Sequence, residues 1–302
     1  MTVAELIEAG ASQLAAAGVA FGHGTSNAFD EAAWLVLWQL GLPLDTPLDG
    51  PKSLANQAVA DEKQAQVASL FSARISSRKP SAYLTREAWL QGVAFYVDER
   101  AIVPRSFIAE LLVNERLDCW LAESTCKVLD LCTGNGSLAV LAAMAYPDVM
   151  VLASDISTDA LAVARINIDK YHLQDRVGLL VANGLASVDG LFDLILCNPP
   201  YVNSTSMAAL PPEYKAEPAL ALDGNTQGGH DGMDFIRQLL VDAPRHMSQG
   251  AVLVLEIGNE RVNFEAAFPR LEVVWLQTSA GDDQVLLVTR EMLQADHDTL
   301  PS

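Results

Sequence analysis

Asn198-Pro199-Pro200-Tyr201 is the short segment of the chain best suited to hold a planar nitrogen group. It follows the apolar run 194–197, which is typical of a buried strand, and two consecutive prolines stop sheet pairing and stiffen the backbone there. The Asn198 side-chain oxygen and the Pro199 carbonyl could each accept one N–H of an amino group. Tyr201 could offer its ring as a flat surface. We therefore expect Asn198, Pro199, Pro200 and Tyr201 to form a catalytic, acceptor-binding turn.

A planar –NH2 group is a poor nucleophile because its lone pair is delocalised. Two fixed oxygens would orient this nitrogen and provide preorganised electrostatic stabilisation, which favours in-line transfer of a group such as methyl. No strong base is needed, because the methylated nitrogen is acidic and can release its proton to water. The alternative is a plain proline-stiffened connection. Cys197, in the apolar run, is expected to be a core residue rather than a nucleophile.

A glycine-rich turn in "VLDLCTGNGSLAV" (128–140) indicates a nucleotide-binding end of the same site. Gly134 and Gly136 permit a tight turn and close backbone approach. Asp155 ends the next apolar run, 21 positions (155 − 134) after Gly134, where a carboxylate can reach ribose hydroxyls. This spacing also satisfies the loose dinucleotide fingerprint, and Asp155 could instead be a helix N-terminal charge.

Two further residues favour S-adenosylmethionine as the cofactor. The carboxylate of Asp130 suits a positively charged ligand and would repel a pyrophosphate. Asn183, in "VANG", could contact an adenine edge, although an asparagine beside Gly184 could also be a simple turn residue.

The elements that must position these residues alternate between strand and helix from residue 127 onward. Apolar runs predict strands at 127–132, 149–155, 176–182, 191–197 and 250–258, and a terminal pair at 272–277 and 283–290. Helices are expected at 136–147, 157–172 and 231–247. Such units form an α/β fold whose parallel sheet has helices on both faces, and ligands bind at the carboxyl ends of its strands.

The first 104 residues have a different pattern. Residues 1–85 predict three helices, at 3–18, 27–43 and 54–78, which would form a small helical domain. Residues 86–104 alternate as strands do, and Gly92 could make the turn of a linking β-hairpin. A helix is expected over 106–123 with Ser106 as its N-cap. The remaining residues, 105–302, would form the catalytic domain.

The composition narrows the classes of function. The chain has 302 residues, half of them hydrophobic, and a formal net charge of −19, which argues against a phosphate-tracking surface. The charge favours solubility or attracts a basic macromolecule. The N-terminus reads as a helix rather than a signal peptide, and four cysteines without a CxxC pair are typical of reduced thiols in a cytoplasmic protein. Five scattered histidines predict no metal site.

Four segments carry a resemblance to a known family: "DERAIVPRSFIAELL" (98–112), "LDLCTGNGSLA" (129–139), "SDISTDALAVA" (154–164) and "LPPEYKAEPALAL" (210–222). With the Asn-Pro-Pro-Tyr turn, they resemble the HemK/Prm protein-glutamine N5-methyltransferases over nearly the whole chain. Within that family the chain is most similar to the branch that methylates large-subunit ribosomal protein L three. Cys132, where the release-factor branch usually has glycine, supports that choice together with the run after Arg105.

The resemblance implies a class I, Rossmann-like methyltransferase fold with a mostly parallel seven-stranded sheet. It also implies that residues 1–85 recognise substrate and that Asn198 to Tyr201 hold the glutamine amide, with Glu217 and Pro218 shaping the pocket wall. Asn183 departs from the family, which usually has an acidic residue there. The cofactor-lining residues that it implies are Asp130, Thr133, Gly134, Asn135, Gly136, Asp155 and Ile156.

The sequence therefore predicts S-adenosylmethionine-dependent N5-methylation of a glutamine in ribosomal protein L three, with no membrane partner. One alternative is a release-factor glutamine methyltransferase. Another is an adenine-N6 nucleic-acid methyltransferase, which would need a Lys/Arg-rich target-recognition region and base extrusion. A third is a non-enzymatic nucleotide-binding module, which would leave the stiff Asn-Pro-Pro-Tyr turn unexplained.

Overall fold

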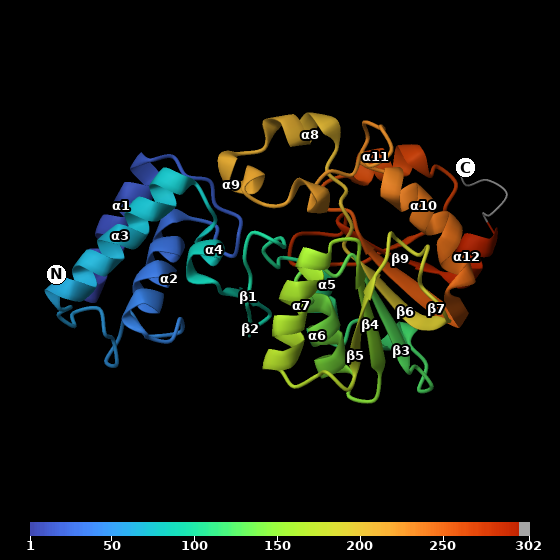
Figure 1. Cartoon of the computed structure of the whole chain (residues 1–302), viewed down its shortest axis with the longest axis horizontal. Coiled ribbons are helices and arrows are strands. Elements are labelled where there is room, and N and C mark those ends of the chain that lie inside the picture. The colour runs from blue at the N-terminus through green and yellow to red at the C-terminus, as the bar shows by residue number, and fades with distance from the viewer. Residues whose placement is uncertain (296–302) are drawn as a thin grey trace.

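A seven-stranded sheet forms the centre of the larger half of the molecule, in the order β5-β4-β3-β6-β7-β9-β8 (Figure 1). The structure is a computed structural model and describes residues 1–295, so residues 296–302 of the predicted catalytic domain lie outside the described residues. The strands are β3 (Lys127–Leu131), β4 (Met150–Asp155), β5 (Val177–Val181), β6 (Phe192–Cys197), β7 (Met247–Glu256), β8 (Val274–Trp275) and β9 (Val285–Thr289).

The pairing of the strands confirms the mostly parallel sheet. Strands β5, β4, β3, β6 and β7 are parallel neighbours, and β9 runs antiparallel to both β7 and β8. The central strand β6 is apolar toward both faces and lies between β3 and β7, as expected for a parallel strand covered on both sides.

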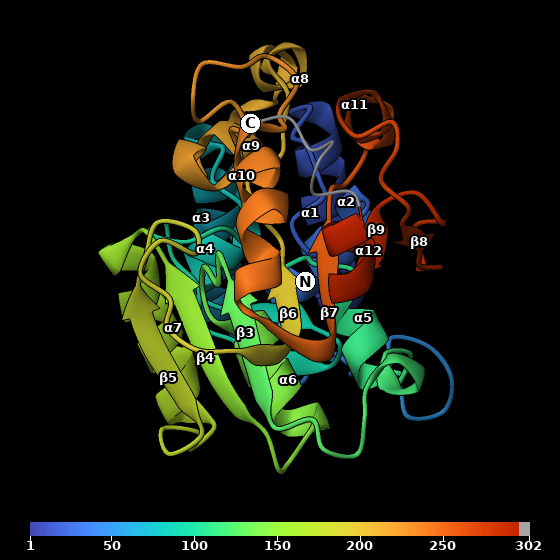
Figure 2. The ribbon, with the colours of Figure 1, turned by 90° about the vertical axis from the view of Figure 1, so that its right-hand side faces the viewer.

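Helices cover both faces of this sheet (Figure 2). One apolar cluster joins one set of strand side chains to α5 (Ile108–Val113), α6 (Ser137–Ala145) and α7 (Thr158–Lys170). A second cluster joins the alternate strand side chains to α10 (Asp234–Asp242), α11 (Arg261–Ala267) and α12 (Arg290–Ala295). Because successive strand residues point to opposite faces, the two clusters use alternating positions such as Leu194 and Ile195.

The N-terminal helices form a cluster of their own around Ile7, Leu35 and Phe71. They are α1 (Val3–Ala16), α2 (Ala28–Leu40) and α3 (Asp61–Ser77), whereas the short α4 (Ser81–Thr85) packs with the hairpin region through Ala82 and Tyr83. Thr2 and Glu5 form a capping box at the start of α1. The third helix begins later than the predicted residue 54, and the expectation of helix over 54–60 was wrong.

A two-stranded hairpin follows, with β1 (Ala88–Leu90) antiparallel to β2 (Val93–Phe95). Gln91 and Gly92 both have positive φ, 50° and 75°, which is the two-residue turn that fits the twist of a hairpin. A small cluster that includes Trp34, Tyr83 and Val103 packs the hairpin region against the helical domain.

The single helix predicted over 106–123 was wrong. Helix α5 ends at Val113, Glu115 has a left-handed φ of 56°, and only a short 3-10 turn, η1 (Asp118–Trp120), follows. Ser106 accepts a hydrogen bond from the Ile108 amide (3.2 Å), but its hydroxyl also donates to Glu256 at the end of β7 (2.5 Å).

The segment after β6 contains elements that the sequence did not predict. Helices α8 (Ser204–Ala209) and α9 (Pro212–Lys215) and the 3-10 turn η2 (Ala219–Ala221) arch over the carboxyl edge of the sheet, between the helical domain and α10 (Figure 1). A third 3-10 turn, η3 (Ala243–Arg245), follows α10. In the described part of the chain, no helix combines the length and apolarity that a bilayer crossing requires.

Candidate active site

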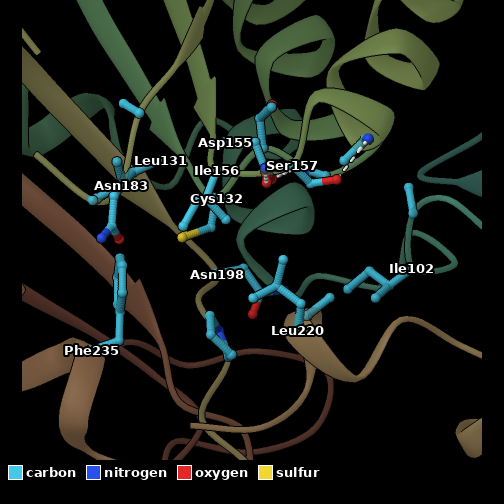
Figure 3. Close-up of a pocket in the computed structure, with 18 of the residues that line it drawn as sticks. Ile102, Leu131, Cys132, Asp155, Ile156, Ser157, Asn183, Asn198, Leu220 and Phe235 are labelled. Carbon is cyan, nitrogen blue, oxygen red and sulfur yellow. Dashed lines mark hydrogen bonds between the residues drawn. The ribbon is translucent and has the colours of Figure 1, made fainter. Parts of the chain in front are cut away.

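A cavity of about 580 Å³ lies at the carboxyl edge of the sheet. Its wall is built from the segments that follow β3, β4, β5 and β6, together with parts of α10 and of η2 (Figure 3). This is where parallel α/β sheets bind ligands. Nine of the predicted site residues line it: Thr133, Gly134, Asn135, Asp155, Ile156, Asn183, Asn198, Pro200 and Pro218.

Asp155 and Gly134 are directly joined at the nucleotide end. The Gly134 amide donates to Asp155 Oδ2 and the Ser157 amide donates to Oδ1, each over 2.9 Å. A carboxylate has about four acceptor positions, so roughly two remain for a ligand. Burial raises the pKa of Asp155, and hydrogen bonding by the backbone amides of Ser157, Gly134 and Ile156 opposes that shift.

Gly134 and Gly136 serve the turn in different ways. Gly134 has a φ of 56°, and no atom lies within 4 Å of where its Cβ would be, so the backbone is open to the cavity. At Gly136, with a φ of 79°, a Cβ would lie 3.0 Å from the Ala164 Cβ of α7. Gly136 therefore permits close packing of the turn against α7 and does not line the cavity.

Asp130 lies beneath the glycine turn and is fully buried. Its Oδ2 accepts hydrogen bonds from the Thr133 hydroxyl (2.5 Å) and the Ala139 amide (3.0 Å), which fixes both ends of the turn. Oδ1 has no hydrogen-bond partner among residues 1–295. Burial raises the pKa of Asp130 to about 7. Asp130 is absent from the cavity wall, so in this structure its contacts are with the turn itself.

The wall also includes residues that the sequence analysis missed. Phe235, at the start of α10, faces Asn183 in the close-up, and its ring lies 3.5 Å from the Cβ position of Gly184 (Figure 3). Ile102 and Leu220 form part of the opposite wall. Phe235 has no local sequence signal, whereas Leu220 lies inside the 210–222 segment already singled out.

The stiff turn after β6 brings Asn198 into the same cavity (Figure 3). Cys197 is paired in register with Leu131 of β3 and with Leu255 of β7, so Asn198 leaves the sheet between those two strands. The Asn198 carboxamide makes no hydrogen bond to another residue within 1–295, so it is available to a ligand.

The other half of the turn packs away from the cavity. Pro199 is buried, and the Tyr201 ring lies against Gly258, whose Cβ would be 2.6 Å from that ring. Burial raises the pKa of the Tyr201 hydroxyl above its ordinary value. Neither residue is part of the cavity wall, so the expected ring surface of Tyr201 stays a prediction.

Glu217 and Pro218 are also divided between wall and interior. Pro218 lines the cavity, but the buried Glu217 carboxylate accepts two hydrogen bonds from Arg105 (2.6 and 2.8 Å). Burial acts to raise the pKa of Glu217, but the charges and hydrogen bonds of Arg105 and His23 together outweigh burial and hold that pKa at about 2. Its contribution to the pocket wall stays a prediction.

The residues that line the cavity fit an adenosyl ligand. Asp155 keeps free acceptor positions and Gly134 leaves its backbone open, while the unpaired Asp130 Oδ1 is a polar atom buried beneath the turn. No group of three or more potential metal ligands occurs in residues 1–295.

The fold and the site define a class I methyltransferase. The crystal structure of the hMettl16 catalytic domain in complex with MAT2A 3'UTR hairpin 6 has the same fold, with a TM-score of 0.51, 12% identity, and coverage of 81% of this chain and 86% of that one. Residues 109–211 match the family model of the Methyltransferase small domain.

Close relatives identify the family more narrowly. A ribosomal protein uL3 glutamine methyltransferase of Bordetella pertussis is 51% identical, over 97% of this chain and 96% of its own. Its counterpart in Burkholderia pseudomallei is 48% identical, over 97% and 96%, and that of Neisseria gonorrhoeae 45%, over 97% and 95%. The chain belongs to the family of ribosomal protein uL3 glutamine methyltransferases, which confirms the family and the branch expected from its motifs.

Proposed function

We propose that this enzyme transfers a methyl group from S-adenosylmethionine to the side-chain nitrogen of a glutamine in ribosomal protein uL3. The observation that carries the proposal is the Asn198 carboxamide in the same cavity as the Asp155–Gly134 turn. The names of the relatives supply the substrate, since they are called uL3 glutamine methyltransferases.

Each end of the cavity has its own part in binding the cofactor. Asp155 would accept hydrogen bonds from the two ribose hydroxyls through its remaining acceptor positions. Ile156, Asn183 and Phe235 would enclose the adenine, and Phe235 would stack against it. When bound, S-adenosylmethionine supplies an electrophilic methyl group on a sulfonium. Thr133, Gly134 and Asn135 would line the cofactor, with Gly136 and Asp130 supporting their turn.

The acceptor turn would orient the glutamine amide. Asn198 Oδ1 and the Pro199 carbonyl oxygen would each accept one N–H, which sets the face of the nitrogen toward the donor. Pro200, together with Pro199, keeps these oxygens in place, so little reorganisation is needed during transfer. The extra proton on the methylated nitrogen passes to water.

The rest of the chain would serve recognition of the protein substrate. Residues 1–85 form the proposed recognition domain, 86–104 its linker and 105–302 the methyltransferase domain. A ribosomal protein binds RNA and therefore carries basic residues, which the charge of −19 would attract. Methylation before or early in ribosome assembly, in the cytoplasm, suits a recessed amide pocket.

The test is methylation of a ribosomal-protein mixture with labelled S-adenosylmethionine, followed by mass mapping of the modified residue. We expect one methyl group on a uL3 glutamine, and weaker labelling of mature large subunits than of the isolated protein. Label found only on a release factor or on nucleic acid would show that uL3 is not the substrate. Labelling of mature large subunits equal to that of the isolated protein would show that the enzyme does not prefer free uL3.

A further inference from the structure

Helix α9 carries a buried glutamate that contacts the N-terminal helical domain. Glu213 is fully buried, and its Oε1 lies 2.8 Å from Arg78 Nε and 3.3 Å from Arg74 Nη1. Arg74 is itself fully buried and also binds Glu31 of α2 (2.7 Å) and the Ala20 carbonyl (2.9 Å). Glu213 is thereby tied to α3, and through Arg74 to α2.

Glu217, which follows the end of α9, contacts the connection between the hairpin and the methyltransferase domain. Besides its two bonds from Arg105, it accepts one from the Val103 amide (2.9 Å). His23 Nε2 of the helical domain lies 3.3 Å from its other oxygen. We call residues 213–217 the strap, because they join both parts of the chain.

Ring contacts of Tyr214 hold the strap in addition to its ion pairs. Tyr214 stands between the two glutamates in the sequence. Its ring centroid lies 4.3 Å from that of His23 and 5.4 Å from the Arg105 guanidinium carbon. A Cβ on Gly22 would be 2.1 Å from the Tyr214 hydroxyl oxygen, so the loop passes very close to the ring.

Charges balance within this junction. The carboxylates of Glu31, Glu213 and Glu217 face the guanidinium groups of Arg74, Arg78 and Arg105. Buried charges are tolerated only when paired, and guanidinium–carboxylate pairs fix both distance and direction. Two apolar surfaces can shift against each other at little cost, whereas only one arrangement of this junction pairs all of its buried charges.

The strap leads directly into the wall of the active-site cavity. Pro218 and Leu220, just after Glu217, line that wall. The Val202 amide donates to the Leu222 carbonyl (2.9 Å) and the Gly224 amide donates to the Val202 carbonyl (3.1 Å), which ties the same segment to the turn that holds Asn198. The position of the helical domain is therefore coupled to the wall beside the acceptor turn.

We propose that Glu213 and Glu217 are positioning residues that hold the helical domain in register with the acceptor turn, so that a glutamine presented on a protein surface reaches Asn198. This inference rests on the proposed function, because it assigns the helical domain a contact with the protein substrate. A short peptide makes no such contact and needs only the cavity. The strap thus supplies the preference for the protein over the peptide.

The experiment compares two acceptors, purified uL3 and a peptide that spans the glutamine methylated in it by the wild-type enzyme. For Glu213→Gln, we expect kcat/KM with the protein to fall at least about tenfold, since a misplacement of ~1 Å can cost on the order of 100-fold. With the peptide, kcat/KM should change less than about twofold, and the Kd of S-adenosylmethionine should stay unchanged. Lys215→Gln, at an exposed position of the same helix, is the matched control and should behave as wild type with both acceptors.

A second variant keeps the test decisive if Glu213→Gln does not fold. Arg78, which is 26% exposed, is the outer partner of Glu213 and also donates to the Ala17 (3.0 Å) and Gly18 (2.8 Å) carbonyls. Arg78→Gln leaves the buried Arg74–Glu213 pair in place and should give the same split between protein and peptide at smaller size. Equal losses with both acceptors, or no loss in either Glu213→Gln or Arg78→Gln, would overturn the inference. Wild-type enzyme that methylates neither acceptor would instead reject the proposed function, and the inference with it.

Discussion

Replacement of Asp155 by alanine should act mainly by weakening the binding of the cofactor. Two of its acceptor positions are taken by the Gly134 and Ser157 amides, which leaves about two for ribose hydroxyls. A hydrogen bond to a charged group contributes about 1.5 kcal/mol at the low end of its range, so two of them contribute about 3 kcal/mol. The Kd of S-adenosylmethionine should therefore rise on the order of 100-fold.

Isothermal titration calorimetry with wild type, Asp155→Ala and Asp159→Ala measures this directly. Asp159 is an exposed carboxylate in the first turn of α7, so its variant removes the same charge without the two amide contacts and should bind as wild type. A thermal scan confirms that each variant is folded at the titration temperature. If Asp155→Ala bound the cofactor within about threefold of wild type, less than ~1 kcal/mol, the assignment of its free acceptor positions to the ribose would be wrong.

Three further predictions concern the turn after β6 and the residue beneath the glycine turn. Asn198→Ala should lower kcat about 100-fold or more, as loss of one preorganised polar group does, while cofactor affinity by calorimetry stays unchanged. Gly258→Ala should lower the free energy of unfolding by about 2–4 kcal/mol in urea titrations, because its backbone has a φ of 53° and its Cβ would meet the Tyr201 ring. The folded Asp130 carboxyl, with a pKa of about 7, keeps a proton that the unfolded chain releases near pH 4. The contribution of Asp130 to the free energy of unfolding should therefore fall as pH rises from about 4 to about 7, so the wild type should lose more stability over that interval than Asp130→Asn does.

Each of these has an outcome that contradicts it. Loss of cofactor affinity in Asn198→Ala would show that the residue belongs to the nucleotide end. An unfolding curve of Gly258→Ala that coincides with wild type would mean that Tyr201 moves freely. Parallel stability profiles of wild type and Asp130→Asn would show that the buried carboxyl is ionised in the folded protein throughout.

The sheet and the glycine turn could be predicted from sequence because their signals are local. Apolar runs of six to nine residues predicted the strands, and the residues that follow the parallel strands meet at one edge of the sheet. Gly134 and Asp155 were both expected at the nucleotide-binding end on that ground, whereas the hydrogen bond between the Gly134 amide and the Asp155 carboxylate was found only in the structure.

The remaining features depend on residues far apart in the chain. Arg74 and Glu213 are 139 positions apart, so no local sequence pattern predicts that they form an ion pair. The Tyr201 ring packs on Gly258, at the end of another strand, and that contact turns it from the cavity. The predicted helix over 106–123 failed because Glu115 adopts a left-handed conformation and the Arg116 side chain donates to the Gln277 carbonyl (2.6 Å).

The central place of β6 has a consequence for how the enzyme loses activity on heating. Its residues 194–197 pair with strands on both sides and are fully buried, so their amides should exchange with solvent only when the whole domain opens. Asn198 is anchored to that most protected strand rather than to a peripheral loop. Inactivation should then coincide with global melting instead of preceding it.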